Sequence, residues 1–442
     1  MELTFNALIE HIKNGQNYFI TGPAGVGKTY TIKAIYQRLK TEGVGVVLTS
    51  TTGINALNLK GITVHKLFGL TNRSDLGYLG FMKQSFLFHG IKKRLAKLQV
   101  IIIDEVSMLR ADTFELINQI LLQTGDPTKP FGGKTLIFTG DFYQISPVVK
   151  SWEKQQNQWL FTAPAWNNSN IKTIILNHVW RQSDPVFINF LHQIRIGKID
   201  QHALKIIQRC VKNKLNEQTT PHFFSTRDEC DTFNQKMLEQ IKSETLLYDA
   251  VVTGKRNRKF AYDKESIFDF CIAKKQLQIK SGMRVIALIN DPKNRFANGS
   301  LGTVIDAINQ TRVCQVTVKF DDYPEPLKLK RYQWTKYNLN GKRVASVKQI
   351  PLIPAYALTI HKSQGMTLPK AIIDCKNIFA CGQLYVALSR VKSLNELQLL
   401  NFHPRQLITA KVVSDYYALV KQELKDSIQL QLPHQHNLDQ RE

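Results

Sequence analysis

Residues 18–29 read YFITGPAGVGKT, and this stretch decides the fold. The apolar run YFIT comes first, and GPAGVGKT, from Gly22 to Thr29, opens a segment with helical periodicity. A strand, a glycine-rich loop and a helix in this order predict a phosphate-binding loop, because glycines let backbone N–H groups converge on phosphate oxygens where a helix begins. The alternative is a glycine-rich turn that binds nothing, and the flanking strand and helix argue against it.

The loop motif predicts a role for each of its polar side chains. Lys28 is expected to reach the β and γ phosphates of a nucleotide, and the hydroxyl of Thr29 is expected to ligand Mg²⁺. A nucleoside triphosphate and Mg²⁺ are therefore the expected ligands. The expected nucleotide contacts are Gly22, Pro23, Ala24, Gly25, Val26, Gly27, Lys28, Thr29 and Tyr30.

A second motif follows the apolar run VIIID. Asp104 and Glu105 stand where a buried parallel strand would deliver them to the carboxyl edge of the sheet, beside the loop. Adjacent strand residues point opposite ways, so we expect Asp104 to serve a Mg²⁺-bound water and Glu105 to act as the base for the attacking water. A solvated strand end is the alternative for such a common pair. Gln144, after the run LIFTG, could orient the γ-phosphate or the water.

Apolar β-branched runs alternate with helical segments from Tyr18 to Leu176, which is typical of a parallel sheet covered by helices. Residues 67–98, rich in aromatics and lysines, are longer than an ordinary connection and read as an insertion. A second α/β unit opens near residue 221 and resumes after 350. Between them, residues 245–350 show short alternating strands and turn signals, which predict a small inserted antiparallel barrel. The tail from about 403 ends in polar sequence.

Composition narrows the function classes. Hydrophobic residues make up 43% and charged residues 21% of the 442, which is typical of a folded globular protein. Lys and Arg number 59 against 35 Asp and Glu, a formal net charge of +24, which favours nucleic acid as the partner. The 6 cysteines form no C-x-x-C pair, so neither a zinc ribbon nor a disulfide framework is indicated. No membrane span or secretion signal is recognisable, which indicates a cytoplasmic protein without a membrane partner.

Two arginines and one polar cluster become candidates for functional residues because they occur together with the motifs above. Arg181 in NHVWRQSD and Arg390 in YVALSR could neutralise negative charge in a transition state, although an isolated arginine is more often a surface ion pair. The cluster HKSQG, His361 to Gly365, is suited to phosphate or backbone contacts. An ordinary helix start with capping remains the alternative for that cluster.

These motifs together resemble the Pif-type superfamily 1 DNA helicases, whose relatives include RecD and phage Dda. Eight blocks occur in the order of that family, over about residues 18 to 400. They are GPAGVGKT, TSTTGINALNLKGITVHKLFG, IIIDEVSML, LIFTGDFYQISPV, LNHVWRQSD, GMRVIALIN with ANGSLGTV, AYALTIHKSQGMTL and YVALSRVKSLNEL.

The resemblance implies roles for the matching residues. It implies one ATP site between two RecA-like domains, with Lys28 as the Walker lysine and Thr29 and Asp104 as the Mg²⁺ ligands. Glu105 would be the catalytic base and Gln144 the γ-phosphate sensor. Arg181 and Arg390 would be the two arginine fingers, and Gly365 a further nucleotide contact. Single-stranded DNA would contact Thr51, Thr52 and His65 on the first domain and Thr359, His361 and Lys362 on the second.

The resemblance also implies a domain plan. The first RecA-like domain would comprise residues 1–66 and 99–200, with a wedge or pin at 67–98. The second would comprise 201–244 and 351–402, interrupted by a Src-homology-like barrel at 245–350, and a C-terminal helix and tail would follow at 403–442. One departure concerns adenine: where the family carries a glutamine near the N-terminus, LTFNALIEHI offers Asn6, so other nucleoside triphosphates could be accepted.

The implied activity is ATP-dependent 5′ to 3′ movement on single-stranded DNA with unwinding of forked duplex, and also of R-loops or G-quadruplexes, in replication, repair or recombination. We expect a monomer, nucleoid-associated in a bacterial or viral setting, with no small-molecule metabolic substrate. Three rivals remain open: a translocase that strips proteins without separating strands, a nucleotide-gated binding module without useful turnover, and an RNA substrate. A metabolic kinase would need neither the second unit nor the basic excess.

Overall fold

The computed structural model divides the chain into two compact units. The first contains residues 1–181, 380–382 and 409–442, and the second contains 182–379 and 383–408. The structure describes residues 2–70, 86–147, 158–254, 268, 273–293, 295–296, 298–310, 314–337, 343–423 and 429–431.

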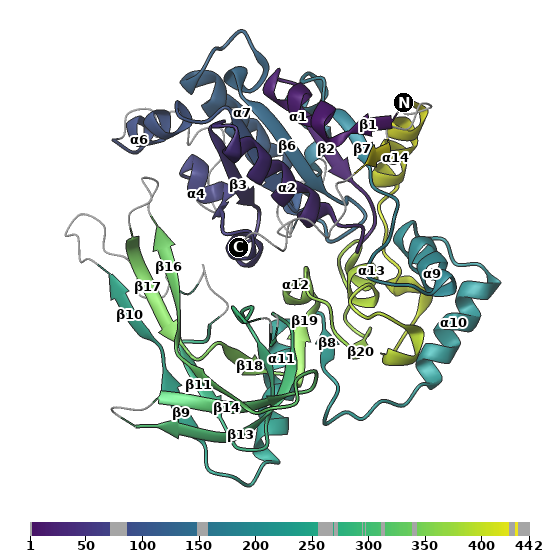
Figure 1. Cartoon of the computed structure of the whole chain (residues 1–442). Coiled ribbons are helices and arrows are strands. Elements are labelled where there is room, and N and C mark those ends of the chain that lie inside the picture. The colour runs from purple at the N-terminus through teal and green to yellow at the C-terminus, as the bar shows by residue number, and fades with distance from the viewer. Residues whose placement is uncertain are drawn as a thin grey trace. The chain divides into compact units, whose positions relative to one another are not determined.

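A six-stranded, fully parallel sheet forms the centre of the first unit, with strand order β4-β3-β5-β6-β2-β7 (Figure 1). Its strands are β2 (Tyr18–Thr21), β3 (Val46–Ser50), β4 (Ile62–Thr63), β5 (Val100–Asp104), β6 (Thr135–Gly140) and β7 (Lys172–Ile175). The helices are α1 (Phe5–Lys13), α2 (Lys28–Thr41), α3 (Gly53–Asn58), α4 (Val64–Phe68), α6 (Phe86–Leu95), α7 (Ala111–Thr124), α8 (Pro164–Asn167) and α14 (Lys411–Glu423). A short parallel pair joins β1 (Glu2–Thr4) to β22 (Gln429–Gln431).

Alternation along the strands divides the core of this unit in two. Every second strand residue, such as Ile20 and Ile102, packs with apolar residues of α1 and α2 in one aliphatic cluster. The intervening residues Phe19 and Phe138 meet an aromatic cluster that includes Phe114 of α7. Both faces of the sheet are therefore buried, which explains why its strands read as continuous apolar runs.

Helix α14 is fastened to the carboxyl end of β2. The buried hydroxyl of Tyr417 lies 2.8 Å from Oγ1 of Thr21 and accepts a hydrogen bond from the backbone N–H of Phe142 at 3.2 Å. The Tyr417 ring stacks on Tyr143, with centroids 5.0 Å apart. The C-terminal helix thus joins the end of β2 to the loop after β6.

We expect Tyr417→Phe to lower the thermal midpoint of the protein. The substitution leaves the Phe142 N–H and the Thr21 hydroxyl buried without this partner, and an unsatisfied buried group costs about 1–3 kcal/mol. Differential scanning fluorimetry measures the change. Tyr332→Phe, at a tyrosine that is 43% exposed, is the control and should leave the midpoint unchanged. Equal midpoints for the two variants would contradict a structural role for the Tyr417 hydroxyl.

The second unit has its own parallel sheet, in the order β19-β8-β20-β21. Its strands are β8 (His222–Phe224), β19 (Ala357–Thr359), β20 (Ala371–Asp374) and β21 (Leu397–Leu400). The helices are α9 (Pro185–Arg195), α10 (Gln201–Lys212), α11 (Arg227–Glu239), α12 (Ile360–Ser363) and α13 (Gln383–Leu388). Strand β8 precedes residue 245 and the other three follow residue 350, as the sequence predicts.

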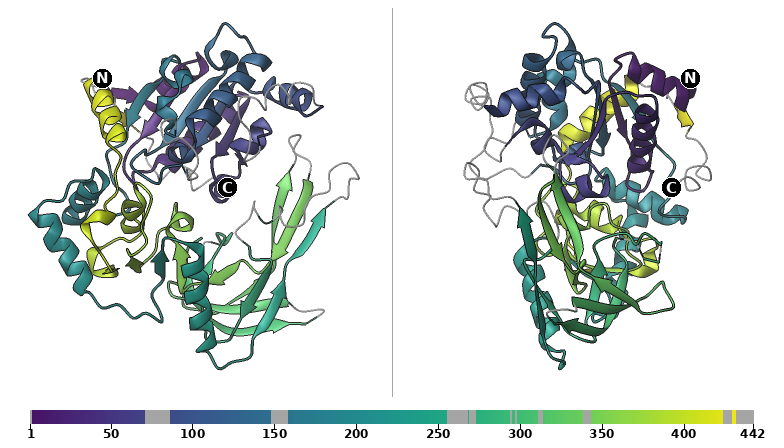
Figure 2. Two further views of the ribbon diagram at one scale, coloured as in Figure 1. Left: turned by 180° about the vertical axis from the view of Figure 1, so that it is seen from behind. Right: turned by 60° about the vertical axis from the view of Figure 1, so that its left-hand side comes forward.

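The segment between β8 and β19 is antiparallel, and Figure 2 shows its long green strands from two further sides. It forms three sheets in the orders β15-β14-β13-β12-β18, β10-β17-β16 and β11-β9. Their bounds are β9 (Leu246–Asp249), β10 (Val251–Gly254), β11 (Gln276–Ile279), β12 (Arg284–Ala287), β13 (Leu301–Asn309), β14 (Cys314–Phe320), β15 (Leu327–Lys330), β16 (Tyr332–Tyr337), β17 (Arg343–Gln349) and β18 (Leu352–Pro354). The α/β class with two parallel sheets and an antiparallel insertion is thus confirmed.

The observed division differs from the expected plan at two places. The first unit ends at Arg181, so residues 182–200, including α9, belong to the second unit. The C-terminal residues 409–442 belong to the first unit. Residues 71–85, most of the expected wedge, lie outside the described residues. Within the described part of the chain, no helix has the length and apolar character needed to cross a bilayer.

Candidate active site

The strand, loop and helix predicted from GPAGVGKT are β2, residues 22–27 and α2. Gly25 and Gly27 both have φ +84°, a left-handed conformation that favours glycine. At Gly22 a Cβ atom would lie 2.2 Å from the carbonyl oxygen of Leu176, so only glycine fits there. The loop backbone is therefore bent tightly over the N-terminus of α2, where backbone N–H groups are available to an anion.

Lys28 and Thr29 begin helix α2. The Lys28 Nζ donates to the carbonyl oxygens of Gly22 and Pro23, both at 2.8 Å, so the ammonium lies over the loop. The side chain of Thr29 is exposed, and its hydroxyl has no hydrogen-bond partner among the described residues. Both groups are placed where the phosphates of a nucleotide would meet the helix N-terminus.

Asp104 ends β5 and is 2% exposed. One carboxylate oxygen accepts from the Thr139 hydroxyl and from the Glu105 N–H, and the other accepts from Nδ2 of Asn55 at 2.9 Å. Thr139 lies on β6, the strand between β5 and β2. Three donors therefore fix the Asp104 carboxylate at the carboxyl edge of the sheet.

The donor set fits Mg²⁺ in its usual role beside a nucleotide. This ion keeps several waters and needs only one or two protein oxygens besides the phosphates. Thr29 supplies a hydroxyl, and Asp104 supplies a fixed carboxylate for a metal-bound water. The described residues contain no group of three or more His, Cys, Asp or Glu side chains that could hold a metal without a nucleotide.

Glu105 adopts a left-handed conformation, with φ 55° and ψ 45°. This is uncommon for a residue with a side chain, and such strain is concentrated at functional sites. Its carbonyl accepts from the Thr51 hydroxyl at 2.8 Å, and its N–H donates to Asp104. The turn explains how two adjacent carboxylates can take different directions. Gln144, 3% exposed, lies in the loop after β6, four residues beyond Gly140.

The first expected DNA-binding group lies at the same edge of the first sheet. Thr51 and Thr52 follow β3, and Thr52 Oγ1 accepts from the N–H of Asn55 at 3.3 Å in the first turn of α3. His65 lies on α4, and burial lowers its pKa. Arg94 in the lysine-rich run on α6 donates to the carbonyls of Lys66 and Leu67, and burial lowers its pKa to about 10. Arg94 therefore ties α6 to α4 rather than offering a surface charge.

Trp180 is a residue that the sequence reasoning missed. Its backbone N–H donates to the Gly25 carbonyl at 2.9 Å, and a Cβ at Gly27 would lie 3.6 Å from the indole Cδ1. The side chain is nevertheless 59% exposed. An exposed aromatic ring beside a phosphate loop is a surface on which a nucleobase can stack. The only clue to Trp180 in the sequence was its position directly before Arg181. Arg181 itself is half-buried. Asn6, the expected base-reading amide, is exposed on α1.

The second unit holds the other expected strand-binding residues at the end of β19. Thr359 caps α12, with its hydroxyl accepting from the N–H of Lys362 at 3.3 Å. Burial lowers the pKa of His361, and Nε2 of this ring is buried with no hydrogen-bond partner among the described residues. Gly365 has φ +81° and open space where a Cβ would lie, so it turns the chain after α12. The alternative interpretation as a capped helix start is therefore correct in part.

Arg390 is 2% exposed, so it is not a surface ion pair. Its Nε donates to the Val386 carbonyl at 2.8 Å, and Nη1 lies 3.4 Å from the carbonyls of Ser363 and Met366. The guanidinium therefore joins the end of α13 to the turn after α12. If the Arg390 guanidinium also contacts a nucleotide, it does so in addition to holding α13 and the turn after α12 together.

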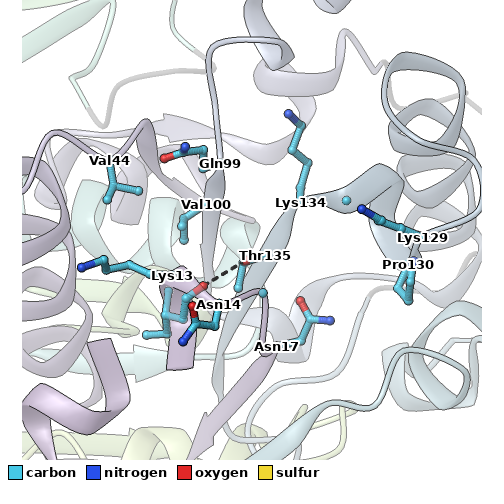
Figure 3. A pocket seen from close by; sticks show the side chains of 13 residues that line it. Lys13, Asn14, Asn17, Val44, Gln99, Val100, Lys129, Pro130, Lys134 and Thr135 are labelled. Atoms are coloured by element: carbon cyan, nitrogen blue, oxygen red, sulfur yellow. Dashed lines mark hydrogen bonds between the residues drawn. The ribbon is translucent and has the colours of Figure 1, made fainter. Parts of the chain in front are cut away.

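Figure 3 shows a pocket of about 710 Å³ whose lining includes none of these residues. Its lining includes Asn17, Val44, Gln99 and Lys134, which precede β2, β3, β5 and β6. The pocket therefore opens at the amino edge of the sheet, whereas the phosphate loop and Asp104 lie at the carboxyl edge. Ligands of open α/β sheets bind at the carboxyl edge, so this pocket is not the nucleotide site.

A family model and a curated relative both identify Pif1-type helicases as similar to this chain. The family described as PIF1-like helicase matches residues 2–205. The ATP-dependent DNA helicase Pif1 of Bdellovibrio bacteriovorus is 31% identical over 412 residues, which cover 92% of this chain and 90% of that protein.

Solved structures resemble the whole chain as well. The crystal structure of Bacteroides sp Pif1 in complex with ADP-AlF4 matches with a TM-score of 0.79 and 28% identity, over 96% of this chain and 98% of that one. A structure described as the basis for DNA unwinding at forked dsDNA by two coordinating Pif1 helicases matches with a TM-score of 0.65 and 29% identity, over 95% and 96%.

Proposed function

This chain belongs to the PIF1-like helicase family, and we propose that it is an ATP-dependent DNA helicase that moves 5′ to 3′ on single-stranded DNA and unwinds duplex. The observation that carries the proposal is the arrangement at the carboxyl edge of the first sheet. Lys28 lies over a phosphate loop, and Asp104 and Glu105 lie at the end of a strand in the same sheet. The relatives' names supply the DNA substrate.

The residues act on ATP in distinct ways. Lys28 leaves the loop carbonyls to pair with the β and γ phosphates, while the loop N–H groups hold the remaining oxygens. Thr29 and Asp104 would hold Mg²⁺, which neutralises charge on the phosphates when bound. Glu105 accepts the proton of the attacking water, Gln144 orients that water or the γ-phosphate, and Arg181 and Arg390 neutralise charge in the transition state. Trp180 offers its indole to the base, which fits acceptance of more than one nucleoside triphosphate.

The strand is bound on both units in this proposal. Thr51, Thr52 and His65 contact it on the first unit, and Thr359, His361 and Lys362 contact it on the second. The net charge of +24 supports binding through phosphates. We propose that the protein acts as a monomer on forked DNA, and that R-loops and G-quadruplexes in replication, repair and recombination are further substrates.

One experiment tests the motor and its polarity together. ATP hydrolysis is measured with and without single-stranded DNA, beside unwinding of forks that carry only a 5′ or only a 3′ tail. We expect DNA to stimulate hydrolysis and the 5′-tailed fork to be unwound. Unwinding from the 3′ tail alone would contradict the polarity. Stimulation without unwinding would favour the translocase, and hydrolysis that ignores DNA would remove DNA as the partner.

A further inference from the structure

A small pocket in the second unit gathers three positively charged side chains. It has a volume of about 60 Å³, and its lining includes Arg227, Lys274 and Lys362. These residues come from α11, from the chain before β11, and from α12. Asp231 is the one carboxylate among its lining residues, which leaves an excess of two positive charges.

Two of the three cations form no ion pair with a described residue. Neither Arg227 nor the Lys362 ammonium has an ion-pair or hydrogen-bond partner in the part of the chain that the structure describes. Lys274 lies 3.3 Å from Asp231, and this pair is largely exposed. Burial, followed by the charges of Arg227 and Lys274, lowers the pKa of Lys362. Asp231 offsets only part of this charge, so the remaining positive charges disfavour one another until an anion joins them.

The local structure fixes this arrangement. Arg227, Cys230, Asp231 and Asn234 share one face of α11, since they are spaced at three- and four-residue intervals. Asn234 accepts from the N–H of Ala357 at 3.0 Å and donates to its carbonyl at 2.9 Å, which holds α11 against β19. Thr359 at the end of β19 also lines the pocket and caps the helix that carries Lys362. The pocket therefore adjoins an expected strand contact.

We propose that this pocket is an anion site that holds one backbone phosphate of the bound DNA strand, with Arg227 and Lys274 joining Lys362 as its ligands. The inference rests on the proposed function and deepens it, because neither Arg227 nor Lys274 belongs to the sequence motifs. A phosphate fits both the small volume and the fork of donors that a guanidinium presents. A base would need an aromatic side chain on which to stack, and none of the lining residues is aromatic.

The first test measures affinity for a fluorescein-labelled oligothymidine at several salt concentrations. Arg227→Ala and Lys274→Ala should each weaken binding, and Arg227→Ala by about tenfold or more, since hydrogen bonds to charged groups are the strong ones. Loss of one phosphate contact should reduce the slope of log affinity against log salt by about 0.7. Lys205→Ala, at an exposed lysine on α10, is the matched control and should change neither quantity.

A chemical double-mutant cycle locates the phosphate. Oligothymidines with one neutral methylphosphonate linkage are scanned for the position at which the unmodified protein loses affinity. We expect Arg227→Ala to abolish the loss at one linkage and to preserve it at the others. The same loss at every linkage in both proteins would overturn the proposal. Competition by inorganic phosphate at millimolar concentration, with no linkage dependence, would assign the site to free anions instead.

The outcomes separate this inference from the function on which it rests. If the unmodified protein binds no oligothymidine, the proposed function fails. If it binds with the expected salt dependence while Arg227→Ala and Lys274→Ala both behave like Lys205→Ala, the function stands and the phosphate site is wrong. A thermal melt of each variant excludes misfolding, and Arg227→Lys should recover part of the affinity because it restores the charge without the planar fork.

Discussion

Lys28→Ala is expected to reduce DNA-stimulated ATP hydrolysis by at least about a hundredfold to a thousandfold, the usual cost of removing a group aimed at transition-state charge. The Nζ of Lys28 donates to the carbonyls of Gly22 and Pro23. These contacts lie within the loop, and the core of the unit does not depend on them. Folding should therefore survive the substitution, and the thermal midpoint should stay close to that of the unmodified protein.

The measurement is steady-state phosphate release at saturating single-stranded DNA. Lys33→Ala serves as the matched control, because Lys33 is an exposed lysine on the same helix. Its hydrolysis rate should equal that of the unmodified protein. Unchanged turnover in Lys28→Ala would refute the assigned ATP site, whereas an equal loss in both variants would point to damage to α2 rather than to lost phosphate binding.

Much of this site could be predicted from the sequence because its geometry is local. A glycine-rich loop between an apolar strand and a helix can take few conformations, so the placement of Lys28 and Thr29 follows from spacing. Asp104 ends the strand VIIID, and a parallel sheet brings the carboxyl ends of its strands to one edge. The two parallel sheets and the antiparallel segment follow from the same alternation of patterns.

Long-range contacts could not be predicted in this way. Tyr417 binds Thr21 across 396 positions of sequence, and no pattern near residue 417 indicates that partner. Arg94 lies in a run of basic residues that suggests a surface charge, but its guanidinium contacts the carbonyls that end α4. For Arg390 the alternative from sequence was a surface ion pair, but the side chain is buried against backbone carbonyls. In each case the partner is a backbone carbonyl or a hydroxyl, which every sequence contains and no motif marks.

The boundary between the two units also could not be predicted from sequence patterns. Leu176 donates its backbone N–H to Thr21 at 2.8 Å, and Trp180 donates to Gly25, so the chain remains on the first unit up to the phosphate loop. Gln182 then donates to the carbonyl of Val391 at 2.8 Å, in the second unit. The transition therefore falls inside the motif LNHVWRQSD. The domain plan implied by the resemblance places the boundary later, at residue 200, because the motif itself does not mark where the chain leaves one unit for the other.

Glu105→Gln should separate nucleotide binding from hydrolysis. The amide has nearly the shape of the carboxylate but cannot accept the proton of the attacking water, so we expect hydrolysis to fall by about 10²–10⁴-fold. The left-handed backbone at Glu105 is held by hydrogen bonds of its own main chain to Thr51 and Asp104. Because glutamine adopts that conformation no less readily than glutamate, the fold and the affinity for ATP should be preserved.

Two measurements decide the role of Glu105. Phosphate release reports the chemical step, and equilibrium binding of a fluorescent ATP analogue reports affinity, which should stay within about twofold of the unmodified value because the phosphate contacts come from the loop. Glu10→Gln, which changes an exposed carboxylate on α1, is the control and should leave both unchanged. A normal rate in Glu105→Gln would place the base elsewhere. Loss of ATP binding would instead show that the Glu105 carboxylate takes part in holding the nucleotide and is not limited to the chemical step.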